Sequence, residues 1–273
     1  MRVVMTLLVR DEADIIDSQI RFHLARGVDF FVVTDNGSTD GTTDILEAHA
    51  REGHLHVIRE PRDVSQEASV TSIARLAATT YGADWVINSD ADEFWWPLRG
   101  TLKDAFASVP KAVGKVRAPW RHFPPRPGDA TFSERLVARL RIAQPPRWHS
   151  HVKTAHRADP SVVVGGGNHD AEVSGSALHE QPIEILHFPF RSREQFERKY
   201  VRWCSLLGNE PAPRFQEARA AYQRGQLGRL YDSYVVSDRT LRNGLREGVY
   251  ALDTRLRDEL RSSRGLASAE PRP

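Results

Sequence analysis

The chain has 273 residues, 40% of them hydrophobic and 27% charged, and its formal net charge is +2. These values are those of an ordinary globular protein and exclude a disordered or membrane-embedded chain. The single cysteine, Cys204, excludes a disulfide framework and a metal site built from several thiolates. Only seven mostly apolar residues separate Met1 and Arg2 from Arg10, too few for a signal peptide or a membrane span, so we expect a cytoplasmic protein.

Strand and helix patterns alternate along the first third of the chain. Continuous apolar runs predict buried strands at 3–9, 30–33, 54–59 and 84–88. Apolar residues at helical spacing predict helices at 15–26, 43–52 and 69–81, and each is followed by a glycine that can end it. The alternation is typical of right-handed β-α-β units and predicts an α/β fold with a parallel, doubly wound sheet.

The remaining two thirds of the sequence are less regular. Further strands are expected at 111–119, 149–156, 161–164 and 183–188, and a proline-rich loop at 120–129. Ser192 and Gln195 have the spacing of a capping box, which predicts a helix that begins at Arg193. The chain beyond Pro213 also has a helical pattern. From Arg214 to Arg264 it holds eleven arginines against seven acidic residues, and we interpret this excess as a solvated helical surface.

Polar clusters follow three of the predicted strands. They are Arg10-Asp11-Glu12, Asp35-Asn36 and the pair Asp90 and Asp92. Ligands of such sheets bind outside the carboxyl ends of the strands, so the three clusters are expected to line one site. On an extended chain, Asp90 and Asp92 would project to the same face, and a hard divalent cation could balance their charge. The alternative is a solvated acidic turn.

The motifs at these strand ends resemble a known family of enzymes. They are Leu-Val-Arg-Asp-Glu at 8–12, Gly-Val-Asp at 27–29, Thr-Asp-Asn-Gly-Ser-Thr-Asp-Gly-Thr at 34–42 and Asp-Ala-Asp-Glu-Phe at 90–94. Together they are similar to the family 2 nucleotide-sugar glycosyltransferases of the GT-A fold, above all to a bacterial branch with Arg-Asn-Glu and Asp-x-Asp-Glu-Phe motifs. A weaker match returns at 187–192. The resemblance implies a Rossmann-like, mostly parallel sheet flanked by helices, with a C-terminal helical extension.

The resemblance also implies a domain organisation and an activity. We expect a glycosyltransferase domain at 1–210, with a nucleotide-binding half at 1–99 and an acceptor-binding half at 100–210. A helical extension at 211–261 and a disordered tail at 262–273 would follow. The implied reaction is a metal-dependent, inverting transfer of a sugar from a UDP- or GDP-sugar to a hydroxyl group of a glycan, a lipid-linked acceptor or a small molecule. No nucleic-acid partner is implied, and peripheral association with the inner face of the membrane is left open.

Site residues are carried over from the matching motifs one position at a time. Asp35 would read the nucleobase, and the other nucleotide-sugar-binding residues implied are Arg10, Asp11, Glu12, Arg75 and Asp90. Asp11 stands where the branch usually has Asn, and a solvated helix charge is the alternative for Arg75. Asp92 would be a direct, catalytic metal ligand, with Asp90 near the metal and the ribose. His187 is the third ligand expected, with His169 as its rival, and an imidazole beside carboxylates favours Mn²⁺ over Mg²⁺.

Inversion needs a general base that takes the proton of the acceptor hydroxyl. Asp170 is the candidate ranked first, ahead of Glu172 and Glu134. Two alternatives to sugar transfer remain at this point. A nucleotidyltransferase of the same fold type would need a glycine-rich loop after the first strand, which Arg10-Asp11-Glu12-Ala13 lacks. A non-catalytic carbohydrate- or nucleotide-binding protein would differ in releasing no nucleoside diphosphate.

Overall fold

The computed structural model describes residues 1–60, 66–128, 130–141, 152–178, 182–206 and 213–267. The chain divides into two compact units, Met1–Trp120 with His151–Leu186, and Arg121–Ser150 with His187–Pro273. We describe each unit by itself. The domain limits expected at 210 and 261 stay predictions, although the last helix runs on to Ala267 and so into the segment expected to be disordered.

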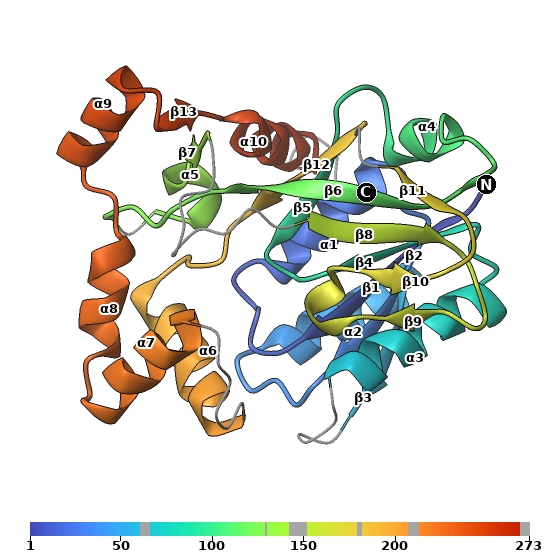
Figure 1. Cartoon of the computed structure of the whole chain (residues 1–273), viewed down its shortest axis with the longest axis horizontal. Helices are drawn as coiled ribbons and strands as arrows, with labels where there is room; N and C mark the ends of the chain where they lie inside the picture. Colours follow the sequence, from blue (N-terminus) through green and yellow to red (C-terminus); the bar gives the residue numbers. More distant parts are fainter. Residues whose placement is uncertain (61–65, 129, 142–151, 179–181, 207–212, 268–273) are drawn as a thin grey trace, which may run out of the picture. The chain divides into compact units, whose positions relative to one another are not determined.

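The first unit is built on a nine-stranded sheet (Figure 1). Its strands are β1 (Val3–Val9), β2 (Phe30–Asp35), β3 (Leu55–Arg59), β4 (Trp85–Ser89), β5 (Glu93–Pro97), β6 (Val113–His122), β8 (Val152–Arg157), β11 (Ser176–Leu178) and β12 (Ile183–His187). The order is β3-β2-β1-β4-β8-β6-β12-β5, with β11 beside β6. The first four strands are parallel, as the alternation of strands and helices predicts, whereas β8 runs antiparallel to both β4 and β6. The sheet is therefore mixed but mostly parallel, with helices at its faces, as in the GT-A fold.

Four helices connect the strands of the first unit: α1 (Ile16–Ala25), α2 (Thr42–Arg51), α3 (Gln66–Thr79) and α4 (Leu102–Ala107). The sequence predicted the first three, but β5 and α4 were not predicted. A short antiparallel pair, β9 (Val163–Val164) and β10 (Ala171–Glu172), flanks the 3-10 turn Gly166–Asn168. The strand expected at 161–164 is thus only two residues long.

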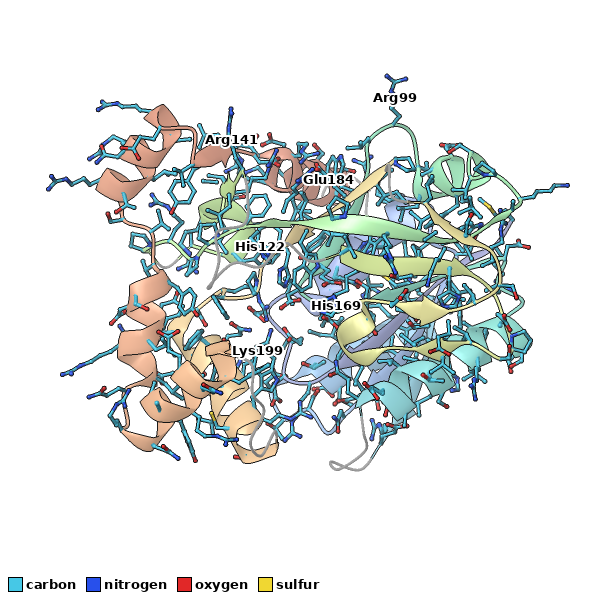
Figure 2. The ribbon with its side chains drawn as sticks, in the orientation of Figure 1. Arg99, His122, Arg141, His169, Glu184 and Lys199 are labelled. Carbon is cyan, nitrogen blue, oxygen red and sulfur yellow. The ribbon has the colours of Figure 1, made fainter. Side chains whose placement is uncertain are left out.

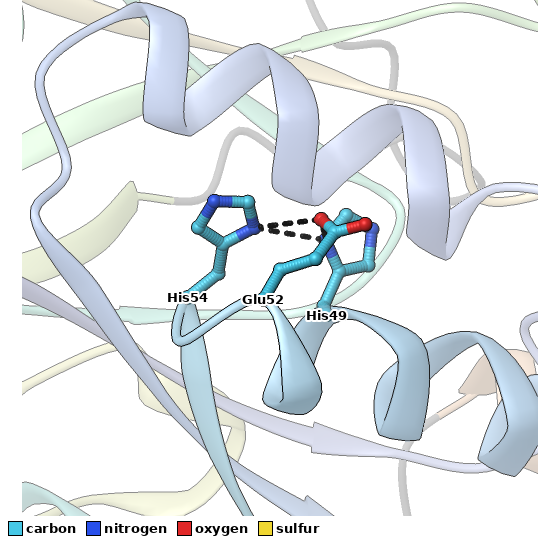
Figure 3. Close-up of side chains that lie close together, drawn as sticks. All are labelled: His49, Glu52 and His54. Atoms are coloured by element: carbon cyan, nitrogen blue, oxygen red, sulfur yellow. Dashed lines mark hydrogen bonds and ion pairs between the residues drawn. The ribbon is translucent and has the colours of Figure 1, made fainter.

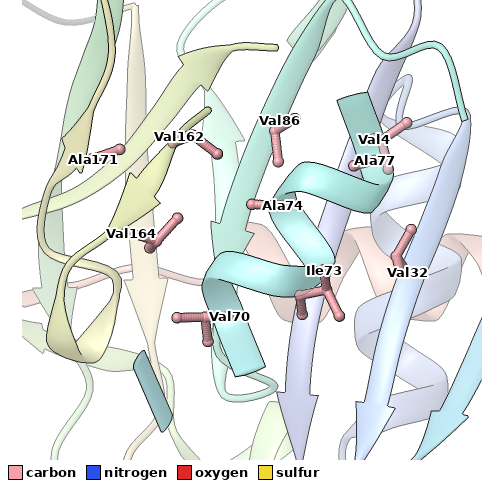
Figure 4. Packing of buried hydrophobic residues seen from close by; sticks show 10 residues of the cluster. All are labelled: Val4, Val32, Val70, Ile73, Ala74, Ala77, Val86, Val162, Val164 and Ala171. Atoms are coloured by element: carbon pink, nitrogen blue, oxygen red, sulfur yellow. The ribbon is translucent and has the colours of Figure 1, made fainter. Parts of the chain in front are cut away.

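Helix α3 shows how the sheet is covered. Its buried residues Val70, Ile73, Ala74 and Ala77 recur at the spacing of one helical face. They pack against valines from three parallel strands and against the segment around β9 (Figure 4), namely Val4, Val32, Val86, Val162, Val164 and Ala171. The small alanines let the helix approach the sheet closely, and each buried valine contributes about 1.5–3 kcal/mol relative to an exposed one. This packing fixes the three strands whose ends carry the polar clusters.

The second unit is largely helical. Its elements are α5 (Phe132–Arg135), β7 (Ala138–Leu140), α6 (Arg193–Leu206), α7 (Pro213–Gln223), α8 (Leu227–Tyr234), α9 (Asp238–Arg246), β13 (Tyr250–Leu252) and α10 (Arg255–Ala267). At the start of α6, Ser192 Oγ accepts a hydrogen bond from the Gln195 amide, as the capping-box pattern predicts. Aromatic residues of α6 and α8 share a core with α7, and in it the Phe196 and Tyr200 rings lie 4.4 Å apart. No helix among the described residues combines the length and the apolar character needed to cross a membrane.

Candidate active site

The parallel register brings two of the predicted acidic positions to one edge of the sheet. Val9 of β1 pairs with Asp35 of β2, and Leu7 of β1 pairs with Ser89 of β4. Asp35 and Asp90 therefore lie at the carboxyl ends of strands on either side of β1, and Arg10 follows β1 between them. This is the edge at which doubly wound sheets bind their ligands.

Asp35 is buried, and both of its carboxylate oxygens are engaged. One oxygen accepts the Ser38 amide at 2.9 Å, which closes an Asx turn, and the other accepts the Thr43 hydroxyl at 2.6 Å. Each carboxylate oxygen can accept two hydrogen bonds, so these contacts leave acceptor capacity for a ligand. The local role is to hold the 36–41 loop and the start of α2 against the end of β2.

The segment after β1 is tied to the same loop. Asp11 has a positive φ of 53°, a conformation that Asp and Asn adopt more readily than most residues, so both suit this position. Its carboxylate accepts the Thr39 amide at 2.7 Å, and the Glu12 amide donates to the Thr42 hydroxyl at 2.8 Å. Arg10 Nε is buried and lies 3.6 Å from Asp11 Oδ2, but it has no hydrogen-bond partner within the described part of the chain. A buried donor without a hydrogen bond is suited to an anionic ligand.

The acidic motif forms a turn and not an extended segment. Strand β4 ends at Ser89, and β5 begins at Glu93, whose amide donates to the Asp90 carbonyl oxygen at 3.3 Å. The expectation that Asp90 and Asp92 project side by side from an extended chain is wrong, because the chain turns into β5 at once. The two carboxylates differ in exposure: the Asp90 side chain is 34% exposed, whereas Asp92 is 2% exposed.

Lys153 supplies a positive charge to this turn. Its Nζ lies 2.5 Å from Asp90 Oδ2 and 3.1 Å from Glu93 Oε1, and its side chain is only 1% exposed. On the other side, the Asn168 amide group donates to Asp90 Oδ1 at 3.1 Å. Asn168 is buried and has a positive φ of 62°, so its backbone is held in the left-handed region. Asp90 is thus fixed by two side chains that reach it from distant parts of the sequence.

Glu93 is the fully buried member of this group. Burial raises the pKa of its carboxyl group, the Lys153 ammonium opposes the shift, and Asp90 and Asp92 add to it. The carboxylate accepts the Asp90 amide at 3.0 Å and the Trp120 indole N–H at 2.8 Å, besides its contact with Lys153. Three N–H donors directed at one carboxylate favour its ionised form, but burial outweighs them and raises the pKa to about 8. Burial lowers the pKa of Lys153, but the two carboxylates outweigh burial and raise it, so the ammonium stays charged.

Sequence reasoning missed Lys153. A lysine in the pattern Val-Lys-Thr-Ala-His at 152–156 fits a strand with one solvated face, yet four of the six residues of β8 are buried. Only the burial of β8 between β4 and β6 shows that the ammonium points into the protein. A lysine among buried positions is costly without partners, and that is the one signal the sequence offered.

Arg75 is not brought to this edge of the sheet. Its Nε donates to the Val162 carbonyl oxygen at 2.8 Å and so ties α3 to the loop after β8. Helix α3 runs antiparallel to the strands, so its first residue, Gln66, lies at the carboxyl edge. Arg75 lies roughly 14 Å further along the helix axis, away from that edge. Nucleotide binding by Arg75 stays a prediction, and the contacts here are structural.

Asp170 and His169 follow the 3-10 turn. The Asp170 side chain is 51% exposed and pairs with Lys115 Nζ at 2.7 Å and with the Arg117 guanidinium at 3.0 Å. Burial raises the pKa of Asp170, but its hydrogen bonds to Lys115, the Ala171 amide and Arg117 lower it overall, and this makes the carboxylate a weaker base. His169, labelled in Figure 2, follows the 3-10 turn directly. Its Nδ1 donates to the Val152 carbonyl oxygen at 2.8 Å, and its ring meets Trp120 edge-on.

His187 ends β12 and opens the second unit. Its Nδ1 lies 2.9 Å from His122 Nδ1 within that unit, and both rings are buried. Metal binding by His187, like the base role of Asp170, stays a prediction.

Residues 23–105, from the end of α1 to α4, match the model of the family described as glycosyl transferase family 2. The match covers less than a third of the chain and includes the strand ends that carry Asp35 and Asp90. This segment is therefore similar to family 2 glycosyl transferases, and the rest of the chain lies outside the match. No curated protein matches the chain.

Similar solved structures include three glycosyltransferase-related chains. The structure of S. aureus TarS 1-349 with UDP shares 14% identity over 82% of this chain and 71% of that chain, with a TM-score of 0.47. GalNAc-T7 with UDP, GalNAc and Mn²⁺ shares 13% identity over 85% of this chain and 54% of that chain, with a TM-score of 0.45. Glucosyl-3-phosphoglycerate synthase from Mycobacterium tuberculosis, with Mn²⁺, UDP and its product, shares 21% over 44% of each chain, with a TM-score of 0.34.

Proposed function

We propose that this glycosyltransferase transfers a sugar from a nucleoside diphosphate sugar to a hydroxyl acceptor, with the donor bound at the carboxyl edge of β1, β2 and β4. One observation carries the proposal. The register places Asp35 and Asp90, both within the segment that matches family 2, at strand ends on either side of Arg10. Asp35 can accept an N–H of a nucleobase, and the Arg10 guanidinium can donate to a diphosphate. The acidic turn can hold the cation that balances the diphosphate.

The residues of the acidic turn fit a divalent cation. Asp90, Asp92 and Glu93 supply carboxyl oxygens at this turn, and the Lys153 ammonium lies beside Asp90 and Glu93. Oxygen ligands suit Mg²⁺ or Mn²⁺. We propose that Asp92 ligates the cation and that Asp90, held by Lys153 and Asn168, lies beside it. When bound, such a cation stabilises the negative charge of the departing nucleoside diphosphate.

The chain's own residues have separate roles in this proposal. Asp35 accepts an N–H of the nucleobase while it keeps the 36–41 loop in place. Arg10 Nε donates to a phosphate oxygen and thereby satisfies its buried N–H. Lys153 fixes the orientation of Asp90, so it is a positioning residue. Asp170 remains the proposed base of an inverting reaction, and it would have to leave Lys115 and Arg117 to take the acceptor proton.

A thermal-shift titration tests donor binding. Purified protein is heated with a panel of UDP- and GDP-sugars, with Mn²⁺, with Mg²⁺ and without metal, and UDP is the first nucleotide to try. We expect a rise in Tm that needs both the nucleotide and a metal ion. Asp92→Asn should abolish the rise, whereas Asp84→Asn, just before the amino end of β4, is the matched control and should keep it. His187→Ala and His169→Ala in the same titration decide which histidine acts as a ligand.

Two outcomes contradict the proposal. One is no shift with any of these nucleotides, and the other is an unchanged shift in Asp92→Asn. Release of the nucleoside diphosphate in the presence of an acceptor then separates an enzyme from a binding protein. The anomeric configuration of the product, read by NMR, tests inversion.

A further inference from the structure

A cluster of metal-ligating side chains lies where α2 ends and β3 begins, and the proposed donor site does not use it. Helix α2 ends in a Schellman motif: the Gly53 amide donates to the Ala50 carbonyl oxygen, and the His54 amide donates to the His49 carbonyl oxygen at 3.0 Å. Gly53 has a φ of +79°, which favours glycine, and a Cβ there would meet nothing within 4 Å. The left-handed residue turns the chain back, so that His54 faces the last turn of α2.

Three side-chain atoms meet across this turn (Figure 3). His49 Nδ1 lies 3.3 Å from His54 Nδ1, His54 Nδ1 lies 3.2 Å from Glu52 Oε2, and His49 Nδ1 lies 3.7 Å from the same oxygen. Zinc ligands about 2.0–2.1 Å from a tetrahedral centre lie roughly 3.3–3.4 Å from one another. The triangle therefore has the dimensions of one face of a tetrahedral site.

Asp17 of α1 sets the orientation of the buried histidine. The His49 side chain is 2% exposed, and its Nε2 lies 2.9 Å from Asp17 Oδ1. Since a carboxylate can only accept, Nε2 carries the proton and Nδ1 directs a lone pair at His54 and Glu52. A carboxylate behind a ligating imidazole is the usual outer partner of a histidine bound to zinc.

We propose that His49, Glu52 and His54 bind a divalent cation of the zinc type, with a water molecule in the fourth position and Asp17 as the outer partner of His49. Two imidazoles and one carboxylate favour zinc over magnesium or calcium. Without a cation, the two Nδ1 atoms can share one proton in a hydrogen bond. That hydrogen-bonded cluster is the alternative that the experiment must exclude.

The position of the site indicates a structural role. β3 is the edge strand of the sheet, and its first residue, Leu55, follows His54 directly. Asp35 pairs with Arg59 at the other end of β3, roughly 16 Å away along the strand. A cation here would tie the end of α2 to the edge strand, far from the proposed donor site. It should raise stability and leave sugar transfer unchanged.

Cobalt titration of the full chain tests the proposal. Co²⁺ in a tetrahedral site gives intense visible d–d bands, whereas octahedral Co²⁺ gives weak ones. We use Asp92→Asn as the background, so that the acidic turn contributes no site. We expect one tetrahedral Co²⁺ per chain, displaced by Zn²⁺. Glu52→Gln and His54→Ala should weaken binding at least about 100-fold, and Asp17→Asn should weaken it about 10–100-fold.

His56→Ala is the matched control, because it removes an exposed histidine two residues further along the same segment, and it should bind as the background does. Glu52 and His54 are 50% and 36% exposed, so their variants are expected to fold, and circular dichroism checks this. Zn²⁺ should raise the Tm of His56→Ala but not of His54→Ala. Absence of a tetrahedral spectrum, or equal binding by His54→Ala and His56→Ala, overturns the proposal.

Discussion

Replacing Lys153 with methionine removes the only positive charge that the structure shows bonded to Glu93 within its described residues. Glu93 is fully buried, so its carboxylate would lose the ammonium 3.1 Å away and gain no water. The variant can respond by protonating Glu93. Burial raises the pKa of Glu93 to about 8, so the group is ionised above that pH and mostly protonated at pH 7. Where Glu93 is ionised, the loss of one partner from a buried ion pair costs about 3–5 kcal/mol.

The pH dependence has a definite sign. Burial already raises the folded-state pKa of Glu93 in the wild type, and loss of the ammonium raises it further. The folded variant then keeps a proton at pH values at which the folded wild type has released it. The difference in stability is therefore greatest above pH 8 and shrinks as pH falls towards 7, where both folded states are protonated.

Urea unfolding of wild type and variant at pH 7 and pH 9, in a chelating buffer, measures these differences. The double variant Lys153→Met with Glu93→Gln should recover most of the loss at pH 9, because position 93 then carries no charge. Lys103→Met is the control: its ion pair with Asp29 is partly exposed, and such pairs contribute only about 0.2–1 kcal/mol. A loss below about 1 kcal/mol at pH 9, or a loss that does not change with pH, would show that Glu93 is not an ionised partner of Lys153.

Three further predictions concern the first unit. Burial lowers the pKa of His23 to about 3, so below pH 6.5 the unfolded state takes up a proton that the folded state does not. About 2 kcal/mol of stability should therefore be lost by pH 5. In urea unfolding, the stability of His23→Gln should fall less steeply with pH. Gly114→Ala should lower the free energy of unfolding by about 3 kcal/mol, because the added Cβ would lie 1.8 Å from a backbone oxygen. Gly82→Ala, at positive φ but in open space, should lower it by only about 1 kcal/mol in the same measurement. Asp11→Asn should change the free energy of unfolding by less than about 0.5 kcal/mol, because Asn also suits the positive φ. Asp11→Val should lower it by more than about 1 kcal/mol. Equal losses in the two variants would refute this reading.

The sequence predicts those parts of the fold that depend on local patterns. The strands around Val4, Val32 and Val86 are continuous apolar runs because helices cover them, and the structure confirms the alternation of strands and helices there. The ends of parallel strands follow from the same pattern, which is why Asp35 and Asp90 were predicted to lie at one edge. Strand β5 was missed, because its Glu-Phe-Trp-Trp-Pro sequence has neither a clean alternation nor an aliphatic run, and its burial depends on tertiary contacts.

Two expectations for the site depended on conformation that local patterns do not determine. The two-residue spacing of Asp90 and Asp92 matched an extended chain, but nothing in Asp-Ala-Asp distinguishes an extended chain from a turn. The sequence does not show whether Arg75 faces the carboxyl edge or the loop after β8. That loop, which accepts its hydrogen bond, lies more than eighty residues later in the chain. The cluster of His49, Glu52 and His54 was missed because these side chains meet only through the turn after α2. Asp17, which orients His49, comes from another helix.

The charge of the acidic turn is a property of the fold, and this changes what the motif implies. From the sequence, Asp90 and Asp92 are two like charges whose proximity calls for a cation. In the structure, Glu93 adds a third carboxylate, and Lys153, contributed by a strand that runs against β4, adds an ammonium. Because the lysine is held at a fixed distance from Asp90, it orients that carboxylate before any ligand arrives. Asp90 and Asp92 still offer oxygen ligands beside the lysine, so a divalent cation still fits the turn. What the motif implies therefore depends on four side chains of the fold and no longer on the spacing of two.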